Sequence, residues 1–268
     1  MVPGVESRKA LAARRVIEVL EYFDEHNRHA TVMDIARRYN RPQSSTSELL
    51  TSLVGLGLLY KDPASRIYTL TPRAAILGSL SQPQLIRDGR LSMLIDNLCL
   101  ETGLGTALIG TVGLNAQLFR WKQGAVRLGR TAGGLASGAQ ERLCDTAAGW
   151  LLLSTLPLQR REGMIRRLNA EAPDDLKFGH SEMSARVQGC GCQGYAIGPA
   201  GFGATAEMCA VLLPSETDER PMALSFIYEP TDQVDPMALV ALLQKEVQGC
   251  LDLPTNEVRT LRLVADAA

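Results

Sequence analysis

Apolar residues recur at helical spacing in three successive segments near the start of this 268-residue chain, at about 9–25, 31–39 and from 43 to Gly55 or Gly57. In the second segment, four apolar residues at i, i+3, i+4 and i+7 predict one apolar face: Val32, Ile35, Ala36 and Tyr39. Thr31 is a suitable N-cap for this helix, and Pro42 ends it because proline disfavours helical geometry in the preceding residue. We therefore expect three helices, the last two joined by a tight turn.

The third segment has two distinct faces. Its apolar face carries Thr46, Leu49, Leu50 and Leu53, and the opposite face carries Ser44, Ser47, Glu48 and Thr51. Short hydroxyls and a carboxylate can meet base edges in the DNA major groove, where a glutamate can accept from a cytosine amino group. A solvated helix surface shows the same pattern, so this face alone leaves both interpretations open.

A short hairpin pattern follows the third segment. Residues 59–61 and 66–70 look like two strands around a turn at 62–65, which is typical of a DNA-binding wing. Cations at its tip can reach a phosphate or the minor groove, or can be ordinary surface charges. Helices and hairpin together predict a winged helix-turn-helix with these DNA-binding residues: Arg37, Arg38, Arg41, Gln43, Ser44, Ser45, Ser47, Glu48, Thr51, Lys61 and Arg66.

Five blocks of this region stand in the order and at the spacing expected for one known family: residues 13–20 (ARRVIEVL), 33–38 (MDIARR), 41–46 (RPQSST), 57–62 (GLLYKD) and 68–73 (YTLTPR). They resemble the DNA-binding domain of the IclR family of bacterial transcriptional regulators. Weaker blocks at 103–108, 192–197 and 223–230 resemble the effector domain of that family. The resemblance implies a DNA-binding domain at 9–70, a linker helix and break at 71–83, and a GAF-like effector-binding and oligomerisation domain at 84–268.

The second half of the chain alternates helical and strand patterns. A long helix is expected at 84–102, a Gly-rich loop at 133–139, and further helices at 145–154, 158–168, 181–193 and 236–251. Strands are expected at 106–112, 116–121, 125–130, 195–197, 207–213 and 222–228. The predicted fold class is α+β, with the winged helix-turn-helix followed by a GAF-like α/β effector-binding domain.

The resemblance also implies an effector pocket. The family's His before the first effector-domain helix, its acidic run, its Cys and its small strand hydroxyls are replaced here by less polar residues, and these make the implied pocket more apolar. An apolar or aromatic small-molecule effector is therefore favoured over a small oxo-acid, although the same residues could simply fill the core. The implied effector-binding residues are Cys144, Asp145, Thr146, Trp150, Met208, Phe226 and Tyr228.

Charge and composition lead to expectations about the partners of the protein and its location in the cell. The whole chain has a net charge of −1, but residues 1–80 carry 11 Lys and Arg against 8 Asp and Glu, which gives +3. This small positive charge indicates that a single DNA-binding domain, or head, binds DNA poorly. We therefore expect a homodimer or a dimer of dimers on a pseudo-palindromic operator. The sequence lacks an apolar run of membrane-spanning length and a signal peptide, which predicts a cytoplasmic protein with no membrane partner and with reduced cysteines.

Two other function classes remain. The Cys190-Gly191-Cys192 pair, together with Cys144, Cys209 or His180, could form a metal or redox sensor on the same scaffold, although a second closely spaced pair is missing. An enzyme with an accessory DNA-binding head is the third possibility, but none of the histidines at 26, 29 and 180 stands in a nucleophile motif. We expect no catalytic residue, no metal and no cofactor, and a repressor as the default over an activator.

Overall fold

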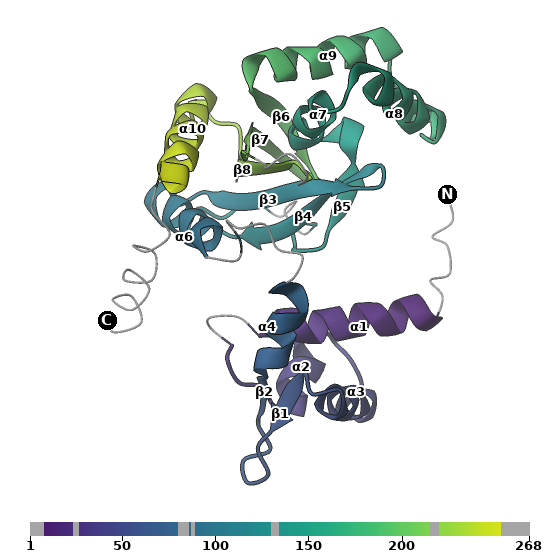
Figure 1. Ribbon diagram of the computed structural model, residues 1–268, viewed down its shortest axis with the longest axis vertical. Coiled ribbons are helices and arrows are strands. Elements are labelled where there is room, and N and C mark those ends of the chain that lie inside the picture. Colours follow the sequence, from purple (N-terminus) through teal and green to yellow (C-terminus); the bar gives the residue numbers. More distant parts are fainter. Residues whose placement is uncertain are drawn as a thin grey trace. The chain divides into compact units, whose positions relative to one another are not determined.

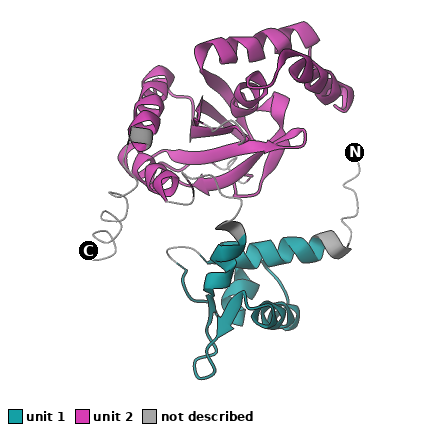
Figure 2. Cartoon of the chain, viewed as in Figure 1, with its two compact units in different colours: residues 1–82 teal, residues 83–268 magenta. Residues whose placement is uncertain are grey.

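The computed structural model describes residues 8–23, 27–79, 86, 89–129, 134–214 and 220–252. The chain divides into two compact units, residues 1–82 and 83–268 (Figure 2). Most of the predicted break between the domains, at 78–83, lies outside the described residues or has no described side chains. Each unit is therefore treated by itself.

The first unit is a winged helix-turn-helix (Figure 1). Its elements are α1(Arg8–Tyr22), α2(Val32–Arg38), α3(Gln43–Gly55), β1(Leu59–Lys61), β2(Tyr68–Leu70) and α4(Pro72–Ser79). Strands β1 and β2 pair antiparallel, and Ala30 bridges to Tyr68 at the edge of this small sheet. The predicted helices and wing are all present, although α1 ends earlier than the pattern indicated.

Local chemistry explains where α2 and α3 begin. The Thr31 hydroxyl accepts from the Asp34 N–H, and the Asp34 carboxylate accepts from the Thr31 N–H at 2.8 Å, which completes a capping box. Asn40 then adopts a left-handed backbone with φ of 49°, and Pro42 opens α3. The turn between the two helices is therefore set by the sequence 39–42.

The second unit is built on a six-stranded antiparallel sheet in the order β5-β4-β3-β8-β7-β6. The strands are β3(Gly105–Val112), β4(Asn115–Lys122), β5(Gln140–Arg142), β6(Tyr195–Gly201), β7(Ala204–Leu212) and β8(Met222–Tyr228). Every residue of β8 is buried, because β8 lies in the middle of the sheet and both of its faces are covered.

Helices cover both faces of this sheet. They are α6(Arg90–Thr102), α7(Ala147–Ser154), α8(Leu158–Ala170), α9(His180–Gln193) and α10(Pro236–Asp252), with 3-10 turns η2(Leu143–Asp145) and η3(Asp174–Leu176). Helices α6 and α10 lie side by side over one face, and α7, backed by α8 and α9, lies on the other (Figure 1). Two separate apolar cores result, one between α7 and the sheet and one between the α6–α10 pair and the sheet.

One predicted strand is wrong. Residues 125–129 form no strand, and the edge position beside β4 is taken by β5. The Val126 N–H donates to the Gly103 carbonyl at 2.9 Å, and a Cβ on Gly124 would lie only 2.1 Å from that oxygen. This close approach turns the segment back along the loop before β3 instead of letting it extend the sheet.

None of the helices in the described residues combines the length and the hydrophobicity that crossing a lipid bilayer requires.

Candidate DNA interface and effector site

Helix α3 presents a polar stripe to solvent. Thr46, Leu50 and Leu53 are buried against the rest of the domain, which leaves the opposite side of the helix exposed. The exposed stripe contains Ser44, Glu48, Thr51 and Ser52. Ser52 is absent from the sequence prediction, although its spacing four residues after Glu48 places it on the same face. Ser45 and Ser47 are half-buried and lie at the two flanks of this stripe.

The hydroxyls of α3 are held by its own backbone. Thr51 donates to the Ser47 carbonyl at 2.8 Å, and Ser52 donates to the Glu48 carbonyl at 2.9 Å. Each hydroxyl oxygen keeps lone pairs that can accept a further hydrogen bond. The stripe therefore offers acceptors at defined positions, together with the Glu48 carboxylate.

Arg41 belongs to the domain interior more than the sequence indicated. Its guanidinium pairs with the Glu18 carboxylate of α1, and the two side chains are only 20% and 22% exposed. The Tyr39 hydroxyl donates to the Glu18 carbonyl at 2.6 Å. Both residues flank the turn before α3, so this cluster ties α3 to α1. The structure thus gives Arg41, which was predicted to bind DNA, a partner inside the domain.

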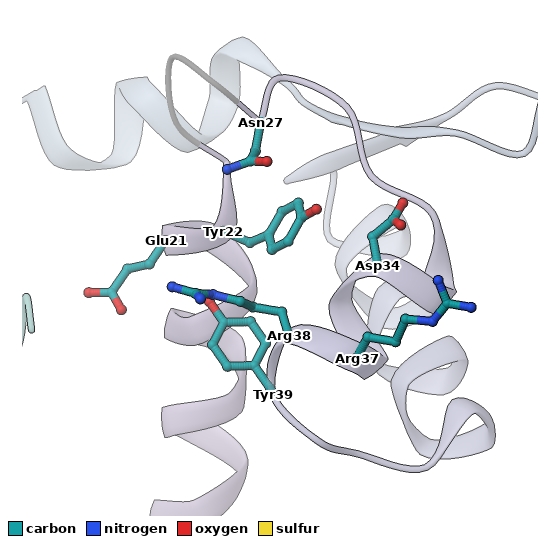
Figure 3. Close-up of a pocket in the computed structure, with 7 residues that line it drawn as sticks. All are labelled: Glu21, Tyr22, Asn27, Asp34, Arg37, Arg38 and Tyr39. Atoms are coloured by element: carbon teal, nitrogen blue, oxygen red, sulfur yellow. The ribbon is translucent and has the colours of Figure 1, made fainter. Parts of the chain in front are cut away.

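Arg37 and Arg38 lie at the C-terminal end of α2 and are exposed. They line an open groove of about 580 Å³ between α1 and α2, together with Glu21, Tyr22, Asn27, Asp34 and Tyr39 (Figure 3). In this groove Arg38 extends toward Glu21, and Arg37 extends toward Asp34. Burial and the neighbouring Glu18 raise the pKa of Glu21 above its ordinary value. The predicted cations therefore stand in a groove of mixed charge.

The wing carries its cations on a tightly hydrogen-bonded turn. Asp62 Oδ1 accepts from the Ala64 and Ser65 N–H groups at 3.0 and 2.7 Å, and these bonds lower the pKa of Asp62. Arg66 is exposed and has a left-handed backbone with φ of 59°. Lys61 Nζ lies 5.4 Å from the centre of the ring of Tyr68, its partner across the hairpin in the pair next to the turn.

In the second unit, η2 and the start of α7 form a closely bonded loop. The Trp150 indole N–H donates to the Cys144 carbonyl at 2.6 Å, and Thr146 caps α7 by accepting from the Gly149 N–H at 2.9 Å. Asp145 forms a bidentate ion pair with Arg142, with N–O distances of 2.7 and 3.0 Å. Met208 contacts the same loop, because its sulfur accepts from the Ala148 N–H at 3.4 Å.

Comparison with known proteins identifies the first unit. Residues 12–63 match the family described as the IclR helix-turn-helix domain. Residues 12–63 therefore form an IclR helix-turn-helix domain. No curated protein sequence matches the chain.

Solved IclR structures share the fold of most of the chain. An IclR homolog from Microbacterium hydrocarbonoxydans, complexed with 4-hydroxybenzoate, is 18% identical with a TM-score of 0.55, covering 93% of this chain and 99% of that chain. A regulator from Alicyclobacillus acidocaldarius is 20% identical, with a TM-score of 0.55 and coverage of 93% and 96%. The Thermotoga maritima IclR is 13% identical, with a TM-score of 0.54 and coverage of 92% and 98%. The predicted resemblance and fold class are thus confirmed: the chain has the fold of the IclR transcriptional regulators.

The predicted effector residues do not share one cavity. Strand register pairs Met208 with Ile227, and Cys209 with Phe226. Since side chains alternate between faces, Met208 lies in the core beneath α7 whereas Phe226 and Tyr228 lie in the core beneath α6 and α10. The prediction that all seven line one site is therefore wrong for Phe226 and Tyr228.

Ser225 is the late-strand hydroxyl that the sequence analysis missed. It is directly opposite Ala107 in the β3–β8 pairing, is fully buried, and donates to the Ala107 carbonyl at 3.3 Å. Ala107 belongs to the core beneath α7. Ser225 thus places a small hydroxyl of β8 on the α7 face, one residue before Phe226, which faces the opposite core.

Five of the six cysteines are buried. Burial raises the pKa of Cys144 and of Cys209 to about 12, and it also raises the pKa of Cys190. Cys192 is exposed, two residues along α9 from the buried Cys190. Across the described parts of the chain, no three His, Cys, Asp or Glu side chains gather closely enough to hold a metal ion. These observations give the cysteine-sensor alternative no support.

Proposed function

We propose that this protein is a sequence-specific transcriptional repressor whose second domain responds to a small-molecule effector. The observation that carries the proposal is the exposed stripe of α3, with its acceptors and its single carboxylate, inside an IclR helix-turn-helix domain. Such a face suits base edges, where hydrogen bonds distinguish one base pair from another.

In this proposal, the wing and the helix have different roles. Ser44, Glu48, Thr51 and Ser52 contact bases, and Arg66 and Lys61 contact phosphates or the minor groove. Gln43, Ser45, Ser47, Arg37 and Arg38 lie around the same helix-turn-helix and contribute at its rim.

We propose that the protein binds its operator as a homodimer or a dimer of dimers. The basic footprint of one head is small, so two heads on two half-sites supply the affinity. Helix α4 exposes Ile76 and Leu77, and α1 exposes Ile17. These apolar side chains are suited to burial against a second copy of the chain.

Effector control is proposed through linkage between the two domains. A ligand shifts the protein between two arrangements only if it binds one of them better. The 4-hydroxybenzoate in the Microbacterium hydrocarbonoxydans homolog supports a small organic ligand for a domain of this fold. The predicted preference for an apolar or aromatic ligand agrees with this, although Phe226 and Tyr228 do not contribute on the α7 face.

The proposal is tested by selecting bound sequences from a random DNA library with the full-length protein, then measuring variants by fluorescence anisotropy. Glu48→Ala should change the preferred bases at about 1–3 kcal/mol per contact, and Arg66→Ala should weaken all sequences and lower the salt slope. Arg160→Ala, on the exposed surface of α8, is the matched control and should change neither. An equal loss on selected and random DNA for both head variants would refute the assignment.

A further inference from the structure

A groove of about 700 Å³ runs between α9 and the edge strand β6 of the second domain. Its walls combine one cation with apolar and amide groups: Trp150, Arg186, Gly189, Cys190, Gln193, Tyr195, Ala196, Ile197 and Pro199. We propose that this groove binds an organic monocarboxylate with an apolar body, held by Arg186. The inference rests on the proposed effector response and gives it a site at the edge of the sheet, where the groove borders the core beneath α7.

Arg186 is held in place by the groove itself. Its guanidinium carbon lies 4.6 Å from the centre of the Trp150 ring. The ring is fixed from two sides, since its N–H bonds to the Cys144 carbonyl and a Cβ on Gly198 would lie 2.8 Å from its Cζ3. The cation therefore sits on a rigid platform, which lowers the conformational cost of binding an anion.

The present partner of Arg186 is easily exchanged. Its Nη2 lies 3.0 Å from the Glu182 carboxylate, four residues earlier on α9, and both side chains are substantially exposed. Exposed pairs of this kind contribute little to stability, whereas a guanidinium can hold a carboxylate through two parallel hydrogen bonds. A ligand carboxylate in the groove can thus replace Glu182 as the partner of Arg186.

Gly189 keeps the groove open. It lies inside α9, where glycine is a poor helix former, and nothing lies within 4 Å of a Cβ added to it. Packing within the chain therefore does not require glycine here. What the missing side chain preserves is space beside Arg186, bounded by the apolar Ala196 and Ile197.

The walls also indicate the kind of occupant. Strand β6 pairs with β7, and Pro199 has no N–H to donate on the outer edge, which disfavours an added peptide strand. A phosphate dianion would require more than the single cation that lines this groove. One arginine beside apolar walls fits a monoanion with an apolar body.

The experiment uses the full-length protein, with benzoate as the probe and benzamide as its neutral counterpart. Thermal shift and titration calorimetry should detect benzoate in the wild type and detect benzamide at least about tenfold more weakly, since the hydrogen bonds to a charged group are lost. Glu182→Gln should bind benzoate more tightly, because Arg186 then has no competing carboxylate.

Two variants test the site independently. Arg186→Met should lower benzoate affinity about tenfold or more and leave benzamide binding unchanged. Gly189→Met fills the groove with a good helix former and should abolish binding of both probes without lowering the melting temperature. Its matched control is Gly163→Met on α8, where an added Cβ also meets nothing within 4 Å and which does not line the groove; this variant should bind like the wild type.

Each outcome decides the proposal. Benzoate that binds Gly189→Met as it binds the wild type, or that does not bind the wild type at millimolar concentration, overturns the assigned site. Operator affinity of every variant is measured without ligand in parallel. Operator binding that persists while benzoate binding fails overturns only this inference, whereas a wild type that selects no DNA sequence overturns the proposed function.

Discussion

Helices α3 and α7 show how differently one chain can use a helix. In α3 one side is buried and the other is a polar stripe in solvent, whereas seven of the eight residues of α7 are buried. A helix with a polar face has a surface available to a partner, and a helix that is apolar all round acts through the packing around it. The comparison separates the two domains. The first domain is expected to act through the exposed surface of α3, and the second through the close packing around α7.

Within α3, the buried and the exposed faces should respond in opposite ways. Leu50→Ala should cost about 2–5 kcal/mol of head stability, because it leaves a cavity beneath the helix. Ser44→Ala should change stability by less than about 0.5 kcal/mol but should alter operator preference. Urea unfolding and anisotropy on the same proteins measure both. Comparable stability losses in the two variants would contradict the division of α3 into a core face and a contact face.

In α7, adding a single methyl group at Gly149 should destabilise the effector domain. A Cβ on Gly149 would lie 2.1 Å from the Leu143 carbonyl oxygen, so Gly149→Ala must displace backbone. We expect a loss of about 1–3 kcal/mol from the effector domain, measured by urea unfolding. Gly163→Ala on α8 is the control and should be neutral or stabilising by up to about 1 kcal/mol. Equal midpoints for the two variants would show that the α7 loop is not tightly fitted.

The capping box of α2 should give a smaller, pH-dependent effect. Thr31→Ala should cost about 1 kcal/mol, because it removes the side-chain cap. Hydrogen bonds from Thr31 lower the pKa of Asp34, so this carboxylate stabilises the fold above its unfolded pKa of about 3.9 and ceases to do so as the pH falls through the lowered value. The wild type should therefore lose more stability than Thr31→Ala on acidification below about pH 4. Parallel pH profiles for both proteins would count against the capping box as the cause.

The smallest stability effect is expected for two arginines that were both predicted from the sequence to bind DNA, Arg41 and Arg66. Arg41→Gln should cost about 1 kcal/mol or less of head stability and should leave the salt slope of DNA binding unchanged, because Arg41 pairs with Glu18. Arg66→Gln should leave stability almost unchanged and should reduce the slope by about 1. Salt titrations of operator binding measure the slopes. A reduced slope for Arg41→Gln would return this residue to the DNA contacts.

Elements that depend on local signals could be predicted from the sequence. The amphipathic spacing of α2 and α3, the N-cap at Thr31 and the break at Pro42 are local signals, and each is present in the structure. The edge strand β5 has only three residues and depends on pairing with β4 far along the chain, so no local pattern indicated it. Residues 125–129 resembled a strand but are held by the loop before β3.

The prediction of the effector residues failed for a different reason. Every residue of β8 is buried, so its sequence shows no alternation of apolar and polar positions that would reveal which side chains share a face. A shift of one residue then exchanges Ser225 for Phe226 and moves the prediction to the opposite core. Similarly, the groove beside Arg186 joins α9, β6 and α7, which only the tertiary fold brings together.

Arg66 sits where conformation and side-chain chemistry favour different residues. Its left-handed backbone costs an L-residue about 1–2 kcal/mol that glycine would not incur, yet the position carries a long cation. Replacing it with glycine should therefore relax the hairpin and make the isolated fold easier to form, while the molecule loses hold on its polyanionic partner. A redesign that optimised this chain for thermal stability alone would choose glycine at this position. It would produce a more stable protein whose wing has lost its cation and binds DNA more weakly.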